Sequence, residues 1–198
     1  MNDAKKIIKT DLIVLTGGPG AGKTAVLEMA KKTICEYVTI LPEAASIIYG
    51  GGFLRLPSLS ARTCAQRAIY HVQNELEKLV VSEQKWLLGL CDRGTLDGLA
   101  YWPLDEASFW EMNQSSIEKE YAKYKAIIHL RTPNDNFGYN HQNPMRTENS
   151  HEARHIDDRI AHIWKNHPDY NVIDSSEDFL TKAQKTLDLI TKYRAMCN

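Results

Sequence analysis

Short apolar runs alternate with longer amphipathic stretches along the chain. Each run is four to six residues long, which suits a buried strand better than a core helix. Alternating strand and helix patterns are typical of proteins in which helices cover both faces of a parallel sheet. The pattern therefore predicts an α/β fold with five strands, at residues 11–16, 37–41, 86–91, 126–130 and 170–173.

Amphipathic spacing predicts six or seven helices between and after these runs. In the longest, at about residues 61–82, aliphatic side chains recur at intervals of three and four and so share one face. Pro42 suits the first turn of a short helix that the glycines at 50–52 would end. The other helices are expected at 23–34, in a mostly helical segment up to about 123, at 151–165, and from about 176.

The segment GGPGAGKT, residues 17–24, lies between the first strand and the first helix and satisfies the pattern G-x-x-x-x-G-K-[ST]. Its glycines allow several N–H groups to face one phosphate, and the new helix adds partial positive charge. Lys23 can reach the β- and γ-phosphates, and Thr24 can bind Mg²⁺. We therefore predict a nucleotide site formed by Gly17, Gly18, Pro19, Gly20, Ala21, Gly22, Lys23, Thr24 and Ala25.

The strand pattern and this motif together predict a P-loop NTPase fold, a three-layer α/β/α sandwich with about five parallel strands and a lid segment. Residues 1–198 are expected to form a single nucleotide-binding domain. The polar stretch 131–150 is long for a loop in a compact domain, and such loops are usually functional. We place the lid at about residues 131–155.

An acidic residue is expected beside the phosphate loop. Asp92 ends the third apolar run, where its carboxylate could join Thr24 around Mg²⁺, a metal that prefers oxygen ligands. Arg93 follows at the carboxyl end of the same strand, the edge at which open α/β sheets bind ligands. Asp97 either supports Arg93 or the metal shell, or is an ordinary polar residue of a helix.

The segment HEARH, residues 151–155, offers a competing chemistry because it fits H-E-x-x-H. On a helix its two histidines would share a face and could bind zinc, with Glu152 as the base of a hydrolase. Ala161 stands where the longer motif has a third histidine, which leaves Glu177 as the candidate third ligand. The alternative is a lid helix that carries Arg154.

Composition and charge narrow the possible partners. The 198 residues include 24 Lys and Arg against 25 Asp and Glu, so the net charge is −1. This balance argues against binding to nucleic acid, which requires concentrated positive charge. No apolar stretch is long enough to span a membrane. The four cysteines are scattered without a CxxC pair, which is typical of reduced thiols, and we expect a cytoplasmic protein.

Several segments of the sequence occur in the same order as in a known protein family. They are GGPGAGKT (17–24), PEAA (42–45), CDRGTLDG (91–98), LRTP (130–133), the stretch from RTE to EAR (146–154), and WKNHPDYNVID (164–174). The chain resembles the AAA-domain-like family of small P-loop ATP/GTP-binding proteins, which includes the TRPL translocation defect protein. That family is similar to nucleoside and nucleotide kinases, and the resemblance extends from residue 11 to about 190.

The kinase resemblance implies catalytic roles. Glu43 matches the base that follows the second strand, although it could instead favour a helix N-terminus through the helix dipole. Asp92 and Arg93 match a pair that contacts metal and phosphates, and Arg146 or Arg154 matches a lid arginine.

The resemblance also implies that Asp174 and Ser175 border the nucleotide base. The expected activity is Mg²⁺-dependent binding of ATP, or GTP, with transfer or hydrolysis of the γ-phosphate. The acceptor stays open, whether a small molecule or water. A nucleotide-gated switch, with little turnover and a protein partner, is the second hypothesis.

Overall fold

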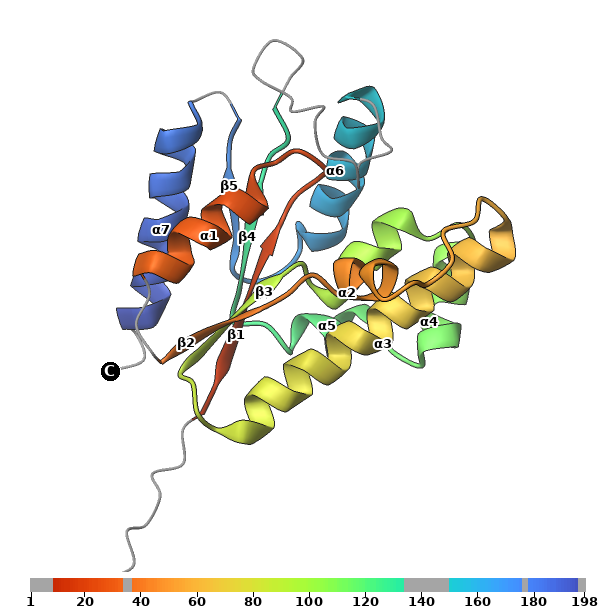
Figure 1. Cartoon of the computed structure of the whole chain (residues 1–198), viewed down its shortest axis with the longest axis horizontal. Coiled ribbons are helices and arrows are strands. Elements are labelled where there is room, and N and C mark those ends of the chain that lie inside the picture. Colours follow the sequence, from red (N-terminus) through yellow and green to blue (C-terminus); the bar gives the residue numbers. More distant parts are fainter. Residues whose placement is uncertain (1–8, 34–36, 134–149, 176–177, 196–198) are drawn as a thin grey trace, which may run out of the picture.

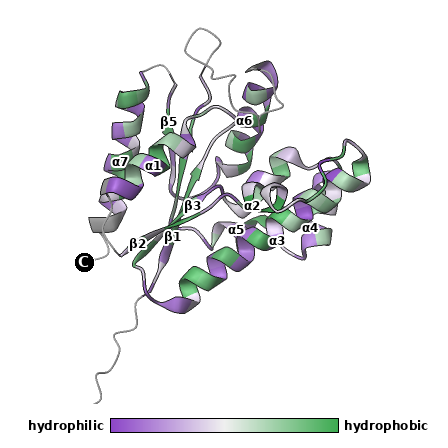
Figure 2. Cartoon of the chain, viewed as in Figure 1, coloured by the Kyte–Doolittle hydropathy of each residue, from purple (hydrophilic) through white to green (hydrophobic). Residues whose placement is uncertain are grey.

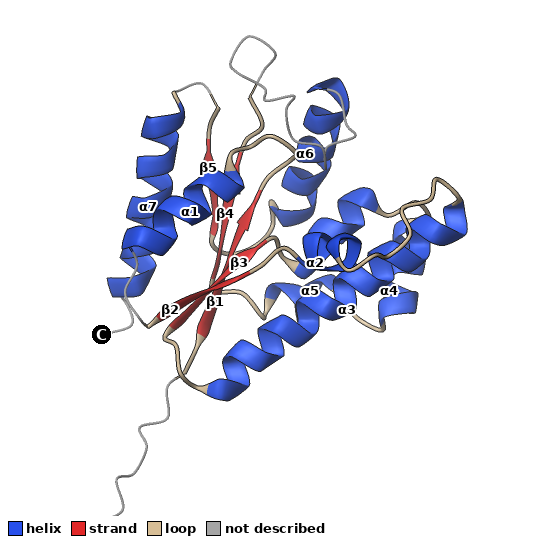
Figure 3. Cartoon of the chain, viewed as in Figure 1, coloured by secondary structure: helices blue, strands red, loops and turns tan. Residues whose placement is uncertain are grey.

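The structure, a computed structural model, describes residues 9–33, 37–133, 150–175 and 178–195. Five strands form one parallel sheet in the order β2–β3–β1–β4–β5 (Figure 3). The predicted parallel five-stranded sheet is therefore confirmed. The strands are β1 (Asp11–Thr16), β2 (Val38–Leu41), β3 (Leu88–Asp92), β4 (Ala126–Leu130) and β5 (Tyr170–Ile173).

Helices cover both faces of the sheet, as a three-layer sandwich requires (Figure 1). One face carries α1 (Lys23–Thr33) and α7 (Phe179–Ala195). The remaining helices are on the other side of the sheet. They are α2 (Ala44–Gly50), α3 (Leu59–Glu83), the 3₁₀ helix η1 (Thr95–Tyr101), α4 (Glu106–Asn113), α5 (Ile117–Tyr121) and α6 (Ser150–Trp164).

Alternate residues of each central strand supply the two halves of the core, because successive side chains of a strand point to opposite faces. In β1, Ile13 and Leu15 belong to the cluster under α1 and α7, whereas Leu12 and Val14 belong to the cluster under α3 and α6. Figure 2 shows that the helices mix hydrophobic and hydrophilic residues, as expected for helices with one buried side.

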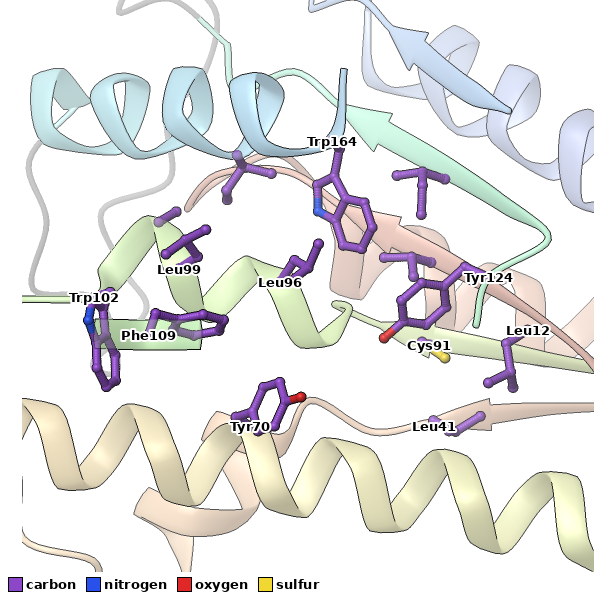
Figure 4. Close-up of a cluster of buried hydrophobic side chains, with 14 of the residues drawn as sticks. Leu12, Leu41, Tyr70, Cys91, Leu96, Leu99, Trp102, Phe109, Tyr124 and Trp164 are labelled. Atoms are coloured by element: carbon purple, nitrogen blue, oxygen red, sulfur yellow. The ribbon is translucent and has the colours of Figure 1, made fainter. Parts of the chain in front are cut away.

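Aromatic side chains bind α6 to the sheet. Trp164, the last residue of α6, is fully buried. Its ring stacks on Tyr121 at 5.7 Å between centroids and meets Tyr124 edge-on at 5.6 Å. Figure 4 shows Trp164 and Tyr124 within the cluster that also contains Leu96 of η1. This packing fixes the position of α6 beside the phosphate loop.

Some predicted boundaries need correction. The helix expected from Pro42 begins at Ala44, because Glu43 has the non-helical dihedrals φ −59° and ψ 117°. The third strand begins at Leu88 rather than at residue 86, and Leu87 instead donates its N–H to the Tyr37 carbonyl. The final helix begins at Phe179, where Asp178 accepts the N–H groups of its first turn.

Other features predicted from the sequence fall on residues that the structure does not describe. Most of the expected lid, residues 134–149, lies outside the described residues, and so do Cys35, Cys197 and Glu177. Within the described part, Cys64 and Cys91 are free thiols. No helix there has both the length and the apolar content needed to cross a bilayer.

Candidate nucleotide site

The phosphate loop, residues 17–24, connects the end of β1 to the start of α1. Gly17 has φ +140°, and a Cβ atom built on it would lie 2.1 Å from the Leu130 carbonyl oxygen. Only glycine fits at this position, because any other residue would clash with the β4 backbone. The loop therefore turns tightly between the ends of β1 and β4, with α1 directly after it.

Lys23 folds back over this loop. Its Nζ donates to the carbonyl oxygens of Gly17 at 2.8 Å and Gly18 at 3.1 Å. Burial, together with the nearby charge of Arg93, lowers the pKa of Lys23 to about 8 against the opposing effect of three carboxylates. Carbonyl groups compensate a buried ammonium group only partly, so an anionic ligand would find an under-compensated cation here.

Arg93 connects the phosphate loop to the start of α2. Its Nε donates to Glu43 Oε1 at 2.6 Å, and its Nη1 donates to the Gly17 carbonyl at 3.1 Å. Arg93 has φ +76°, a left-handed conformation that non-glycine residues rarely adopt and that concentrates at functional sites. Burial disfavours its charge, but Tyr101, Glu43 and Asp97 raise the pKa of Arg93 well above its ordinary value.

Asp97 supports Arg93. Its Oδ2 accepts hydrogen bonds from the Thr16 hydroxyl at 2.6 Å and from Arg93 at 3.3 Å. Its Oδ1 accepts the indole N–H of Trp164 at 2.7 Å. Both oxygens of this buried carboxylate are occupied, which favours the supporting role over a place in the metal shell.

Glu43 occupies the N-cap position of α2, but its side chain caps no backbone N–H. The carboxylate instead accepts hydrogen bonds from Arg93 and from the Ser46 hydroxyl. Burial opposes the charge of Glu43, yet the charge of Arg93 and these two bonds lower the pKa to about 2. The Glu43 side chain therefore binds Arg93 at the site and does not cap the helix.

A cleft of about 220 Å³ opens beside the phosphate loop. Its lining includes Lys23, Thr24, Glu43, Asp92 and Arg93, so these five predicted site residues meet in one place, together with two predicted residues of the phosphate loop. Pro19 and Gly20 complete the lining on the side of the phosphate loop.

Asp92 and Thr24 contribute oxygen atoms to the cleft. Neither side chain makes a hydrogen bond or an ion pair with another residue that the structure describes. Burial raises the pKa of Asp92, and Lys23 opposes that shift. A carboxylate and a hydroxyl that no other described residue engages fit the hard oxygen donor set that Mg²⁺ prefers.

The other predicted residues lie elsewhere. Gly17, Gly18, Ala21, Gly22 and Ala25 form the body of the loop and the start of α1, outside the lining of the cleft. Asp174 and Ser175 follow β5 and do not line the cleft either.

The lid predictions are only partly covered. Arg154 is half-buried on α6 and does not line the cleft, and Arg146 lies outside the described residues. The predicted helix at HEARH is present, with His151 and His155 exposed. Among the residues that the structure describes, no group of three or more His, Cys, Asp or Glu side chains could hold a metal ion, and the candidate third zinc ligand, Glu177, is not one of those residues.

Three polar residues that sequence reasoning missed hold the loop from outside. Asp157 of α6 accepts the Gly18 N–H at 2.7 Å, and Lys182 of α7 donates to the Ala21 carbonyl at 2.9 Å. Thr132, after β4, places its hydroxyl 3.3 Å from the Pro19 carbonyl. A signal existed for Lys182, because it lies one turn after Phe179 on the apolar side of its helix.

Comparison with known proteins agrees with this geometry. A family model described as an AAA domain matches residues 12–181, which contain the phosphate loop, Asp92 and every strand except the first residue of β1. A search of curated proteins gave no match. The match covers most of the chain and the fold has the expected parallel sheet, so this chain belongs to the AAA-domain family of P-loop NTPases, which indicates nucleotide binding.

Proposed function

We propose that this protein is a Mg²⁺-dependent phosphotransferase that moves the γ-phosphoryl group of ATP, or of GTP, to a small acceptor molecule. The observation that carries the proposal is the set of residues that line the cleft. The cleft starts at Lys23 and Thr24 and continues between α2 and α3, where it is lined by groups that no nucleotide phosphate needs. A protein that only hydrolysed nucleotide would require room for water alone.

The acceptor compartment has a mixed lining. Helix α3 presents Gln66, Ile69, Tyr70 and Gln73 to the cleft, at the spacing of one helical face. Tyr101 of η1 also lines the cleft. Amide and hydroxyl groups beside aromatic and aliphatic surface are typical of sites that take small organic molecules.

Buried carboxylates fix this compartment. The Tyr70 hydroxyl donates to Glu120 at 2.6 Å, and the Gln73 amide nitrogen donates to Glu77 at 2.9 Å. Because the Gln73 amide nitrogen donates to Glu77, the side-chain carbonyl oxygen of Gln73 is left to accept a hydrogen bond from the small molecule that receives the phosphoryl group. A pre-formed wall of this kind favours binding of one molecular shape.

The charged groups suit the phosphate end. Lys23 and Arg93 are cations placed to stabilise charge on the phosphoryl oxygens, and backbone N–H groups of the loop add to them. Thr24 and Asp92 would hold Mg²⁺, which would neutralise part of the charge on the phosphate oxygens. A lid arginine, Arg146 or Arg154, would complete the positive environment.

Glu43 would orient the acceptor hydroxyl. With a pKa of about 2 it is too weak a base while Arg93 is bound to it. The proposal therefore requires the γ-phosphate to draw Arg93 away, which would raise the pKa of Glu43 toward its ordinary value. Little proton removal is needed early in a loose phosphoryl-transfer transition state.

The proposal is tested by incubating the protein with Mg²⁺ and γ-labelled ATP or GTP and a panel of nucleosides, nucleotides and vitamins. We expect transfer of label to at least one acceptor. Glu43→Gln should lower kcat by about 100-fold, the low end of general-base effects. It should not weaken nucleotide binding, because Arg93 no longer has to leave a carboxylate to meet the γ-phosphate. Glu28→Gln, an exposed carboxylate on α1, is the matched control and should behave as wild type. If the label is released only as free phosphate, the protein hydrolyses the nucleotide, and the proposed transfer to a small acceptor is wrong.

A nucleotide-gated switch is the second candidate, and one contact favours it. The Gly18 N–H of the phosphate loop is bound to Asp157 on α6, so a change in the loop can reach that helix directly. Tight nucleotide binding with no transfer and very slow hydrolysis would support the switch over the phosphotransferase.

A further inference from the structure

We propose that the phosphoryl acceptor is a small hydroxy compound with an anionic group, a carboxylate or a phosphate, and that Arg55 binds this group. The inference rests on the proposed function, because it names the class of molecule that the acceptor compartment takes. That compartment is the part of the cleft between α2 and α3. Arg55 lines the cleft from the loop 51–58, which joins these two helices (Figure 1).

The cleft extends along α2. Glu43, Ser46 and Tyr49 all line it, and their spacing of three residues places them on one side of the helix. Glu43 marks the phosphate end, because it binds Arg93 there. At a rise of 1.5 Å per residue, Tyr49 lies about 9 Å further along the helix axis. The far end of the compartment is therefore placed to recognise a group of the acceptor that is remote from its reacting hydroxyl.

The charged side chains that line the cleft in the described chain fall into two sets. Those at the phosphate end are Lys23, Glu43, Asp92, Arg93 and Asp97. Arg93 connects two of them, because it donates to both Glu43 and Asp97. Arg55 forms the other set, on the loop that follows α2. It places a cation at the end of the compartment that the phosphate loop does not reach.

Tyr49 positions the Arg55 side chain. The guanidinium carbon of Arg55 lies 5.1 Å from the centroid of the Tyr49 ring, and Tyr49 is half-buried in the last turn of α2. The ring covers one face of the guanidinium group, whose N–H groups lie in its plane. This planar fork matches a carboxylate or a phosphate, which it binds through two parallel hydrogen bonds. An arginine that is already held on an aromatic ring loses less entropy when it binds such an anion.

The charge of the surrounding chain favours an anion at this place. Residues 44–74 include α2, the connecting loop and the first part of α3, and they contain three arginines and no Asp or Glu. The buried carboxylate that accepts the Tyr70 hydroxyl, Glu120, is already paired with Lys123 at 2.5 Å. An anion held by Arg55 would therefore meet no carboxylate from residues 44–74, and like-charge repulsion would be small.

The test compares matched probes that differ in charge. Calorimetry with Mg²⁺ and a non-hydrolysable ATP analogue measures the Kd of pantothenate and its uncharged amide, and of ribose 5-phosphate and ribose. The first pair probes a carboxylate and the second a phosphate. We expect the anionic member of at least one pair to bind about tenfold more tightly than its neutral partner. Arg55→Gln should abolish this preference. Arg62→Gln, an exposed arginine of α3 outside the cleft lining, is the matched control and should keep it.

Kinetics distinguish acceptor binding from an effect on the transferred group. With an anionic acceptor, Arg55→Gln should raise KM about tenfold and leave kcat within about twofold of wild type. Arg55→Lys, which keeps the charge and loses the planar fork, should lie between the two. A loss of kcat with charged and neutral acceptors alike would show that Arg55 meets the transferred phosphoryl group instead.

Two calorimetric results would also overturn the inference. One is equal affinity for the charged and neutral members of both pairs, and the other is a preference for the anion that persists in Arg55→Gln. Failure of the proposed function is a separate outcome, seen as label released only as free phosphate. Calorimetry would still decide in that case whether Arg55 binds an anionic molecule in the cleft.

Discussion

Asp157 Oδ1 accepts the backbone N–H of Gly18 at 2.7 Å and thereby ties α6 to the phosphate loop. The same carboxylate accepts the Thr132 N–H at 3.1 Å and lies 2.8 Å from the His129 ring nitrogen. Burial would raise the pKa of Asp157, but His129, the Gly18 N–H and Arg131 lower it below its ordinary value. Asp157 is therefore an ionised, buried anchor.

Removal of this anchor should be costly. Asp157→Ala would leave the buried N–H groups of Gly18 and Thr132 unpaired, and we expect a loss of about 3 to 5 kcal/mol in the free energy of unfolding. Asp158→Ala is the matched control, since this exposed neighbour pairs with Arg131 at the surface and should cost less than about 1 kcal/mol. Urea unfolding of both variants measures the difference, and equal losses would contradict the anchor role.

Lys182 should give the protein a distinctive response to alkaline pH. Burial, with a contribution from Arg131, lowers its pKa to about 8, against the opposing effects of Asp157 and Asp174. The unfolded chain then binds more protons than the folded one between about pH 8 and the ordinary lysine pKa of 10.5, so stability rises with pH in that window.

The measurement compares urea unfolding of the wild type and Lys182→Met from pH 7.5 to 10.5. Across this window the free energy of unfolding of the wild type should rise by about 3 kcal/mol relative to that of the variant, at 1.36 kcal/mol per pKa unit. Lys185→Met, on the same helix, controls for a general effect of lost charge. A constant difference across the range would show that Lys182 titrates normally.

The fold could be predicted because its signals are local. Each strand is a short, mostly apolar run, and the phosphate loop is a motif of eight adjacent residues between a strand and a helix. Asp92 and Arg93 could be placed at the site because they directly end a strand, and parallel strands bring their carboxyl ends to one edge of the sheet.

The contacts that hold the loop from outside could not be predicted in this way. Gly18 and Asp157 are 139 positions apart in the sequence, and Ala21 and Lys182 are 161 apart. Such contacts depend on how α6 and α7 pack on the sheet, which spacing within one helix does not specify. The pairing of Glu43 with Arg93, 50 positions apart, was likewise invisible, so the sequence left capping and catalysis open for Glu43.

Lys23 should show a conflict between function and stability. Lys23→Met removes a buried cation, so the nucleotide-free variant should be more stable than the wild type by about 1 kcal/mol. The same change should weaken Mg-ATP binding about 100-fold, because a charge-assisted contact to phosphate is lost. Thermal unfolding with and without Mg-ATP measures both effects, and Lys31→Met, an exposed lysine on α1, is the control. Unchanged ATP binding would refute the nucleotide site.

The pair of Glu43 and Arg93 should appear in the acid limb of the stability curve. The pKa of Glu43 is about 2, against an ordinary value of 4.5, so the folded state favours the charged carboxylate. The stabilisation is fully present above pH 4.5 and is lost as the pH falls toward 2. At pH 7 it amounts to about 3 kcal/mol relative to Glu43→Gln, and by pH 3 it should shrink to less than half.

The same pair connects stability to the proposed chemistry. If Mg-ATP draws Arg93 to the γ-phosphate, Glu43 loses its main compensating charge and its pKa rises. The acid-sensitive difference in stability between wild type and Glu43→Gln should then become smaller when unfolding is measured with saturating Mg-ATP or Mg-GTP. Ser46→Ala is the control: it removes only one hydrogen bond to Glu43, so this variant should keep most of the acid-sensitive stabilisation that the wild type has. A difference that nucleotide leaves unchanged would mean that Arg93 stays on Glu43, and Glu43 could then orient an acceptor hydroxyl but never take its proton.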